Sequence, residues 1–474
     1  MSTPDTRVNL GITVMGMRDA VVTRNTQSFT LVDGNPVQEA GKCSLHNVVV
    51  GSEDAASLTS DLVGIAVDDS VSGCVTGVPS APGMETIGIA ADGSTLVGVE
   101  SGRTFIPFGM SFSSPRGGPL VEQRWEDDME DVVADLRELK RMGATFTRVR
   151  LQFRTFIDPP SAGYPNGTPN PVTFANLAKF TRLAAQTGLY LSFSGLRIQR
   201  DLHADDWYSD ATQEERWSAQ ETYWSEIAKT VGASTSVAWY DMMNEPIVPT
   251  EEVMETEDSS GWCPPGGALG GNCFVQYITR TPNGAPAEIA QEWMHRLADA
   301  ITAERDFHLI TIGAAGLVSD QGVAFPCFGP FGTLQADDAR DFLSIHVYPR
   351  MKTVMGVPLG KPTIDDWIQA VKSCKSVDHP MIISEVSNFG VGALDVGDFI
   401  LGSWPEAAGW SGHYYSHTPE QIHVVLADNY TPGVPFRDQT AAFKTAAIDR
   451  AMYREWMAVS TFRTKLMGGG TVQP

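Results

Sequence analysis

From residue 104 onward, short apolar segments alternate regularly with longer amphipathic ones. The apolar segments have the length of buried strands, and the amphipathic ones have the spacing of helices. Such alternation predicts parallel strands, because a parallel pair needs a long crossover that is usually a helix. We therefore predict an α/β fold, a (β/α)8 TIM barrel. The expected strands cover residues 104–112, 144–153, 189–196, 237–244, 308–313, 342–348, 381–386 and 408–415.

The helix after the first strand has the clearest pattern. Apolar residues recur on one face at positions 129, 132, 133, 136 and 139, and Gly143 follows as a stop signal. Ahead of the barrel, Asp92-Gly93 between two short strand segments predicts a hairpin. Further helices are expected at residues 174–186, 213–231, 288–304, 364–374 and 440–457.

Two of the strand segments end in a glutamate. Glu245 follows the apolar run from Val237 and precedes Pro246, and Glu385 ends the run from Pro380. The C-terminal ends of parallel barrel strands meet at one mouth, so we expect these carboxyl groups to lie together. Retaining glycoside hydrolysis needs such a pair, one a protonated acid and the other an ionised nucleophile, roughly 5–5.5 Å apart.

Three motifs each stand at a strand end: Asn244-Glu245-Pro246, the segment 342–348 with His346 and Tyr348, and Ile383-Ser384-Glu385. In this order they resemble the clan A glycoside hydrolases, and family 5 (the cellulase-like enzymes) most closely. The resemblance covers roughly residues 85–460. It implies a retaining glycosidase that cleaves β-linked glycans such as glucan or mannan, with Glu245 as acid/base and Glu385 as nucleophile.

The resemblance also implies roles for other polar residues. Asn244 would donate a hydrogen bond to the sugar 2-hydroxyl. Arg148 ends a segment similar to the family's second-strand motif, whose arginine touches the nucleophile and keeps it ionised. Arg150 lies two residues on, hence on the same strand face, and is a rival for that role. His346 would orient the acid/base side, and Tyr348 would hydrogen-bond the nucleophile.

Two departures from the family pattern concern the bound sugar. Segment 189–196 lacks the histidine that many members carry at the end of strand three. Strand eight commonly supplies a tryptophan beneath the sugar; here Tyr415 aligns best with that place, and Trp410 lies earlier on the strand. We expect both to bind substrate. His413 and His417 are four apart in a strand and a loop, so helical metal pairing does not apply, and we expect no metal or cofactor.

The sequence pattern of residues 1–84 differs from that of residues 85–474, the predicted catalytic domain. Short Val, Ile and Thr-rich segments between turn residues predict a small all-β domain. Sugar-binding modules stack exposed Trp and Tyr on sugar rings, yet Phe29 is the only aromatic residue in these 84. We therefore expect an accessory role in assembly or oligomerisation. A rival interpretation is a virion- or cell-surface protein that uses a glycosidase-like barrel for glycan recognition.

The net charge of −23 disfavours nucleic acid as a partner, because each bound phosphate needs a Lys or Arg. No apolar run approaches the roughly 20 residues that span a bilayer. The first ten residues lack the apolar core of a signal peptide, so an extracellular or particle-associated location would need a removed signal, another export route or carriage on a particle. The sequence leaves two alternatives for these cysteines: local disulfides Cys43–Cys74 and Cys263–Cys273, or free thiols.

Overall fold

The chain divides into two compact units, Met1–Val78 and Pro79–Pro474. In this computed structural model the described residues are 6–9, 20–24, 27–32, 35–37, 45–46, 66–67, 83–112, 121–197, 206–248, 277–279, 284–304, 306, 308–315, 317–319, 322–324, 331, 339–347, 353–354, 357–358, 363–374, 379–386, 395–415, 419–444, 446–447 and 450.

The described part of the first unit consists of short strands. β1 (Thr6–Asn9) pairs in parallel with β2 (Ala20–Arg24), which continues antiparallel into β3 (Gln27–Val32) and β4 (Asn35–Val37). A separate antiparallel pair joins β5 (Leu45–His46) to β6 (Ala66–Val67). Since most of residues 1–82 lie outside the described ranges, the predicted all-β domain over residues 1–84 stays a prediction.

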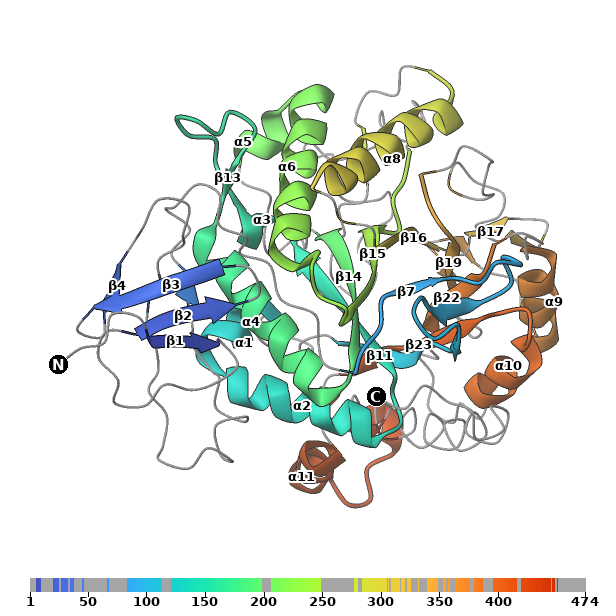
Figure 1. Cartoon of the computed structure of the whole chain (residues 1–474). Helices are drawn as coiled ribbons and strands as arrows, with labels where there is room; N and C mark the ends of the chain where they lie inside the picture. The colour runs from blue at the N-terminus through green and yellow to red at the C-terminus, as the bar shows by residue number, and fades with distance from the viewer. Residues whose placement is uncertain are drawn as a thin grey trace. The chain divides into compact units, whose positions relative to one another are not determined.

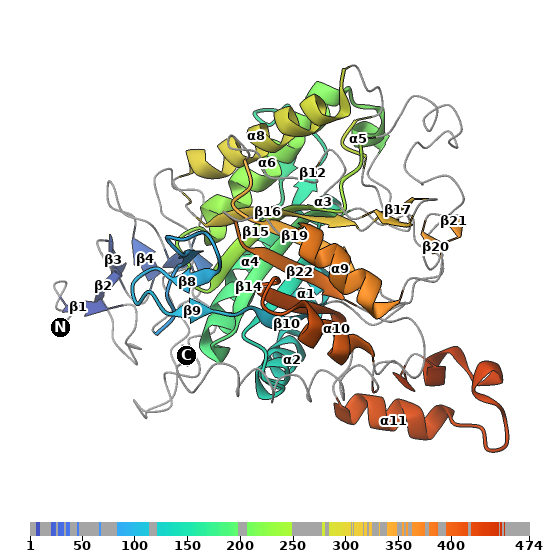
Figure 2. The same ribbon diagram turned by 90° about the vertical axis from the view of Figure 1, so that its right-hand side faces the viewer.

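The second unit contains a closed barrel of parallel strands with helices outside it (Figures 1 and 2), which confirms the predicted (β/α)8 TIM barrel. Its strands are buried along nearly their whole length, as expected of strands covered on both faces. In barrel order they are β10 (Phe108–Phe112), β11 (Phe146–Gln152), β14 (Tyr190–Arg197), β15 (Val237–Asn244), β16 (Leu309–Ala315), β19 (Leu343–Val347), β22 (Met381–Val386) and β23 (Gly409–Tyr415).

The helices follow the strands and begin and end at recognisable signals. Asn170 caps α4 by accepting hydrogen bonds from two backbone amides, and Gly188 ends that helix with a left-handed φ of 68°. Thr212 and Glu215 form a reciprocal capping box on α6. The helices are α1 (Val121–Asp127), α2 (Met129–Arg141), α3 (Phe153–Phe156), α4 (Pro171–Thr187), α5 (Asp206–Asp210), α6 (Gln213–Val231), α8 (Pro286–Ala303), α9 (Ile364–Cys374), α10 (Asp395–Ser403) and α11 (Pro419–Asn429).

A small antiparallel sheet closes the barrel floor. β7 (Ile87–Ile89) and β8 (Leu96–Gly98) form the predicted hairpin around Gly93, and β9 (Thr104–Phe105) adds a third strand. Apolar side chains from this sheet pack against apolar side chains of the barrel strands. The hydroxyl of Tyr190 fastens the two parts, because it accepts from the Glu85 amide (3.0 Å) and donates to the Glu85 carbonyl (3.1 Å).

Some expectations differ from the structure or lie beyond its described part. Helices α1, α10 and α11 were not among the expected ones. Most of the expected helix 440–457 lies outside the described residues. Among the helices that the structure describes, none is both long and apolar enough to cross a membrane.

Candidate active site

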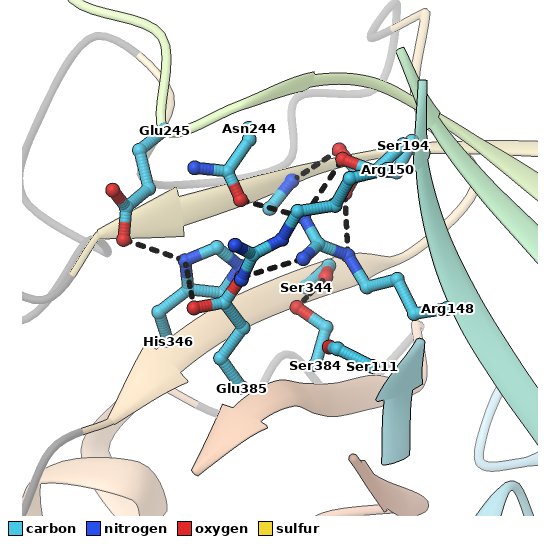
Figure 3. A network of polar contacts seen from close by, with 12 residues as sticks. Ser111, Arg148, Arg150, Ser194, Asn244, Glu245, Ser344, His346, Ser384 and Glu385 are labelled. Atoms are coloured by element: carbon cyan, nitrogen blue, oxygen red, sulfur yellow. Dashed lines mark hydrogen bonds and ion pairs between the residues drawn. The ribbon is translucent and has the colours of Figure 1, made fainter. Parts of the chain in front are cut away.

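Glu245 stands where strand β15 breaks at the barrel mouth. Its backbone has φ 53°, in the left-handed region that non-glycine residues avoid, and it precedes Pro246, which restricts it further. The Glu245 amide donates to the carbonyl of Gly313 on β16 (2.7 Å), which holds the chain in this conformation. Strain of this kind concentrates at functional sites. It turns the partly exposed carboxyl out of the strand and towards the mouth (Figure 3).

Glu385, on β22, is buried beneath two guanidinium groups. Its Oε1 accepts from Arg148 Nη1 (2.5 Å) and forms an ion pair with Arg150. Burial by itself raises the pKa of Glu385. The positive charges of Arg150 and Arg148, together with His346 and His413, outweigh burial and hold that pKa well below its ordinary value. The two arginines proposed as rivals therefore both contact the carboxylate.

Arg148 is the centre of the buried network drawn in Figure 3. Its Nε and Nη2 both donate to Asp241 Oδ2, at 2.9 and 2.5 Å. Nη2 also reaches Ser194 Oγ (2.8 Å) and Asn244 Oδ1 (2.9 Å). Asp241 is fixed in turn by the amide of Gly313, which donates to Oδ1 at 2.8 Å. Sequence reasoning missed Asp241, although a carboxylate inside an apolar strand, four residues before Glu245, is a usable signal.

His346 links the two glutamates. Its Nδ1 lies 2.7 Å from Glu245 Oε1 and 3.7 Å from Glu385 Oε2. The ring is fully buried, and its Nε2 has no hydrogen-bond partner among the described residues. That nitrogen faces Gly313, where a Cβ would lie only 2.6 Å away. The ring therefore fits only because position 313 has no side chain.

The carboxyl groups of Glu245 and Glu385 lie close to each other at the barrel mouth. One ligand atom from each of Glu245, His346 and Glu385 lies within 4.8 Å of the others. An inverting pair is roughly 6.5–9.5 Å apart to admit a water. The same three atoms could in principle hold a divalent cation, but Arg148 and Arg150 already neutralise Glu385 and would repel one.

His413 joins the mouth from β23, and sequence reasoning considered it only for metal binding. Its Nδ1 lies 2.7 Å from Arg150 Nη2 and 3.4 Å from Glu385 Oε2. The usable signal was its position near the end of the last barrel strand, where side chains enter the mouth. Strand three thus lacks the family's histidine, whereas strand eight carries a histidine at the mouth.

A further carboxyl, that of Glu122, is buried beside these residues. Glu122 on α1 accepts from the backbone amide of Gln152 at the end of β11 (2.6 Å), and its Oε2 has no partner among the described residues. Burial raises the pKa of Glu122 to about 7, despite the Gln152 hydrogen bond and the charge of Arg197. Burial and the charge of Arg150 lower the pKa of Arg197 to about 9.

Trp410 was predicted to bind substrate, but in the structure its side chain does not lie at the mouth. Its side chain is buried, its indole N–H donates to Ser403 Oγ on α10 (3.0 Å), and its ring packs on Trp404. Successive strand residues point to opposite faces, so Trp410 faces the helices while Ser411 meets Ser111 of β10. Tyr348 lies outside the described residues; Tyr415 ends β23, but its side chain is not among those described.

Comparison with known proteins places this site in a family. The family model "Cellulase (glycosyl hydrolase family 5)" matches residues 100–396. None of the curated proteins compared with the chain matches it.

Solved structures are similar at low identity. The exo-β-1,4-mannosidase Op5Man5 from Opitutaceae bacterium strain TAV5 is 14% identical with a TM-score of 0.48, and the match covers 79% of this chain and 63% of that one. The endo-1,4-β-mannanase from Rhizomucor miehei is 13% identical with a TM-score of 0.47, covering 79% and 100%. Because the family model spans more than half of its length, the chain belongs to the cellulase family, glycosyl hydrolase family 5.

Proposed function

We propose that this protein is a retaining glycosidase that hydrolyses β-linked glycans by double displacement. The observation that carries the proposal is the pair Glu245 and Glu385, with an oxygen of each within 4.8 Å of the other. Their surroundings differ in the way the two roles require. Two arginines keep Glu385 ionised, whereas Glu245 is partly exposed and has the imidazole Nδ1 of His346 2.7 Å from its Oε1.

In the first step, Glu385 attacks the anomeric carbon. Arg148 and Arg150 both bind its Oε1, and we assign Oε2 as the attacking oxygen. The Oε2–C1 bond forms as the bond from C1 to the leaving oxygen breaks, and Glu245 gives its proton to that oxygen. A glycosyl ester on Glu385 and a free leaving-group hydroxyl result.

In the second step, Glu245 acts as a base. It takes a proton from water, the water oxygen bonds to C1, and the ester bond to Glu385 breaks. His346 holds the Glu245 carboxyl through both steps, because its Nδ1 lies 2.7 Å from Oε1. A carboxyl that swings freely would lose the alignment on which proton transfer depends.

Asn244 is oriented to bind the reacting sugar. Its Oδ1 accepts from Arg148 Nη2 (2.9 Å), so the amide nitrogen is turned away from the arginine. The two N–H donors are then available to the sugar 2-hydroxyl, an interaction that strengthens in the transition state. Arg148 thus fixes both the nucleophile and the amide.

The substrate class that family membership supports is a β-linked polysaccharide such as glucan or mannan. We further propose an extracellular or particle-associated enzyme whose residues 1–84 serve assembly rather than sugar binding. Cys374 is disulfide-bonded, which supports an oxidising compartment. A protein lacking residues 1–84 should keep its turnover on soluble substrate and its affinity for insoluble polysaccharide but change its oligomeric state in light scattering. Binding of glycan by the isolated fragment would contradict this role.

Covalent trapping tests the proposed function. An activated 2-deoxy-2-fluoro glycoside should label the wild-type protein once, and peptide mass spectrometry should find the label on Glu385. Glu385→Gln should not be labelled. For Glu245→Ala, azide should rescue the second step on an aryl glycoside with a good leaving group. A label on another residue, or wild-type turnover in Glu385→Gln, would overturn the assignment. Reducing-end release from a panel of β-glucans and β-mannans then identifies the polymer.

A further inference from the structure

Asp241 is a buried carboxylate to which the proposed reaction gives no step. It lies on β15, four residues before Glu245, and only 1% of it is exposed. Its Oδ2 accepts from Arg148 Nε (2.9 Å) and Nη2 (2.5 Å), and its Oδ1 accepts from the Gly313 amide (2.8 Å). A buried ion pair costs desolvation, and well-packed apolar side chains often stabilise a protein as much or more. Stability alone therefore does not account for a carboxylate at this position.

Through Arg148, Asp241 orients both the nucleophile and the amide of Asn244. Two nitrogens on one edge of the guanidinium, Nε and Nη2, donate to Asp241 and so fix the plane of the group. Nη1 then meets Glu385 Oε1 at 2.5 Å, and Nη2 meets Asn244 Oδ1 at 2.9 Å (Figure 3). Without Asp241 the guanidinium could rotate away from both side chains.

Through Gly313, the same carboxylate supports the turn at Glu245. The Gly313 amide donates to Asp241 Oδ1, and the Gly313 carbonyl accepts from the Glu245 amide at 2.7 Å. The left-handed φ of 53° at Glu245 persists only where the surrounding structure holds it. The two oxygens of Asp241 thus serve the two halves of the glutamate pair, Oδ2 the nucleophile and Oδ1 the acid/base.

We propose that Asp241 is a positioning residue, which holds Glu385 and Asn244 through Arg148 and holds the backbone of Glu245 through Gly313. This inference rests on the proposed glycosidase function and deepens it. It makes recognition of the sugar 2-hydroxyl depend on Asp241, because Asn244 turns its N–H donors to the sugar only while Arg148 holds its oxygen.

Asp241→Asn tests this role with almost no change in side-chain volume. An amide has one acceptor oxygen where the carboxylate has two. Asparagine can therefore accept from Arg148 or from the Gly313 amide but not from both, and its NH2 group then faces another donor. One half of the site must lose its support.

The matched control is Asp306→Asn, the same change at the other end of the barrel. Asp306 is also buried and accepts from Tyr240 (2.6 Å) and from the His308 amide (3.0 Å). It lies just before β16, and the N-terminal ends of the strands face away from the mouth. Asp306→Asn should therefore lower the urea midpoint without changing how the enzyme recognises its substrate.

The measurement is kcat/KM on an aryl β-glycoside and on its 2-deoxy analogue, which is the same compound for glucose and mannose. The ratio of the two values should fall about 10-fold in Asp241→Asn, because the unheld amide no longer binds the 2-hydroxyl. Comparing variants on one pair of substrates cancels the intrinsic reactivity of the deoxy sugar. On the full substrate Asp241→Asn should lose about 100-fold, mainly in kcat. A ratio that stays at the wild-type value in Asp241→Asn, or falls equally in Asp306→Asn, would overturn the inference.

A double-mutant cycle with Arg148→Lys tests whether Asp241 acts through Arg148. Asp241→Asn should cost a smaller factor in the Arg148→Lys protein than in the wild type. Equal factors in the two backgrounds would contradict the proposed role. If Asp241→Asn does not fold, Asp241→Glu keeps the charge but displaces it by one methylene, and the substrate ratio should fall in the same direction. A wild-type protein with no turnover on any glycoside would instead overturn the proposed function itself.

Discussion

At the floor of the barrel, aromatic and aliphatic side chains such as Trp239 and Phe342 fill the space between the small sheet and the strands. The polar groups beside them are paired: Tyr240 donates to Asp306 Oδ2 (2.6 Å), and both ring nitrogens of His308 face acceptors. At the mouth, the same strands carry buried charges instead.

Several mouth atoms also lack a protein partner among the described residues, namely Nε2 of His346, Nε of Arg150 and Oε2 of Glu122. An unpaired buried polar atom costs free energy unless a ligand or water completes it. The floor therefore supplies stability, and the mouth gives some of it up to hold the buried charged groups that surround the two glutamates. The predictions below test this division.

The largest expected effect is at the mouth. Glu385→Gln should reduce turnover by roughly four orders of magnitude, because an amide cannot form the glycosyl ester. It should leave the fold intact, since the amide oxygen can still accept from Arg148 and Arg150. The measurement is kcat on an aryl glycoside together with the urea midpoint. A variant that retains activity would show that this carboxylate is not the nucleophile.

A substitution at the floor should have the opposite effect, a loss of stability with little change in turnover. Trp239→Ala should lower the free energy of unfolding by about 3–5 kcal/mol through loss of buried contacts and the cavity left behind. Turnover per folded molecule should stay close to the wild-type value, counted by titration with the fluoro glycoside. Phe342→Leu gives a milder version if the alanine variant does not fold. Loss of turnover per folded site would show that the two ends are coupled.

Glu122 brings a stability cost at the mouth that depends on pH. Its folded-state pKa of about 7 lies above the ordinary 4.5, so the folded protein keeps this proton to higher pH than the unfolded chain. Stability should therefore fall as pH rises from about 4.5 to about 7, and stay lower above that.

Glu122→Gln removes that titration. At pH 8 it should be more stable than the wild type by roughly 3 kcal/mol, and at pH 4.5 close to it. Glu126→Gln, an exposed residue on the same helix, is the control and should change neither. Urea unfolding at the two pH values makes the comparison. An equal change in stability on Glu122→Gln at both pH values would contradict the explanation that burial of Glu122 causes the pH dependence.

The smallest effect concerns backbone strain. Glycine adopts the left-handed φ of 53° at position 245 without strain, whereas alanine, like the native glutamate, adopts it only at a cost in free energy. Glu245→Gly should therefore be more stable than Glu245→Ala by about 1 kcal/mol, and both should lose the acid/base function. Urea midpoints of the two variants decide this. Equal stability would mean that the strain is relieved elsewhere in the folded state.

The sequence was a good guide to the strands and to the two glutamates. Buried strands are continuous apolar runs, so β22 was predicted over the same residues, 381–386, and its glutamate came with it. Side-chain direction was harder to predict. Register shifts interrupt the pairing of β10 with β23 and of β22 with β23, so sequence position alone did not tell whether Trp410 faced the mouth or the helices.

Contacts between distant strands were also beyond the sequence. Arg148 and Arg150 share a face, and nothing in their spacing shows that both converge on one carboxylate oxygen. Asp241 and His413 acquire their roles only through Arg148 and Arg150, which lie on another strand. Chemistry carried by a motif was predictable, whereas chemistry created by packing was not.

Gly313 shows what this arrangement means for mutational tolerance. A Cβ there would stand 2.6 Å from His346 Nε2, 3.0 Å from Asp241 Oδ2 and 3.1 Å from Arg148 Nη2. A saturation library read out by activity should therefore score position 313 as intolerant, alongside the glutamates, although it contributes no side chain to the reaction. For anyone redesigning this barrel, the empty position limits the choice of residues as firmly as the occupied ones.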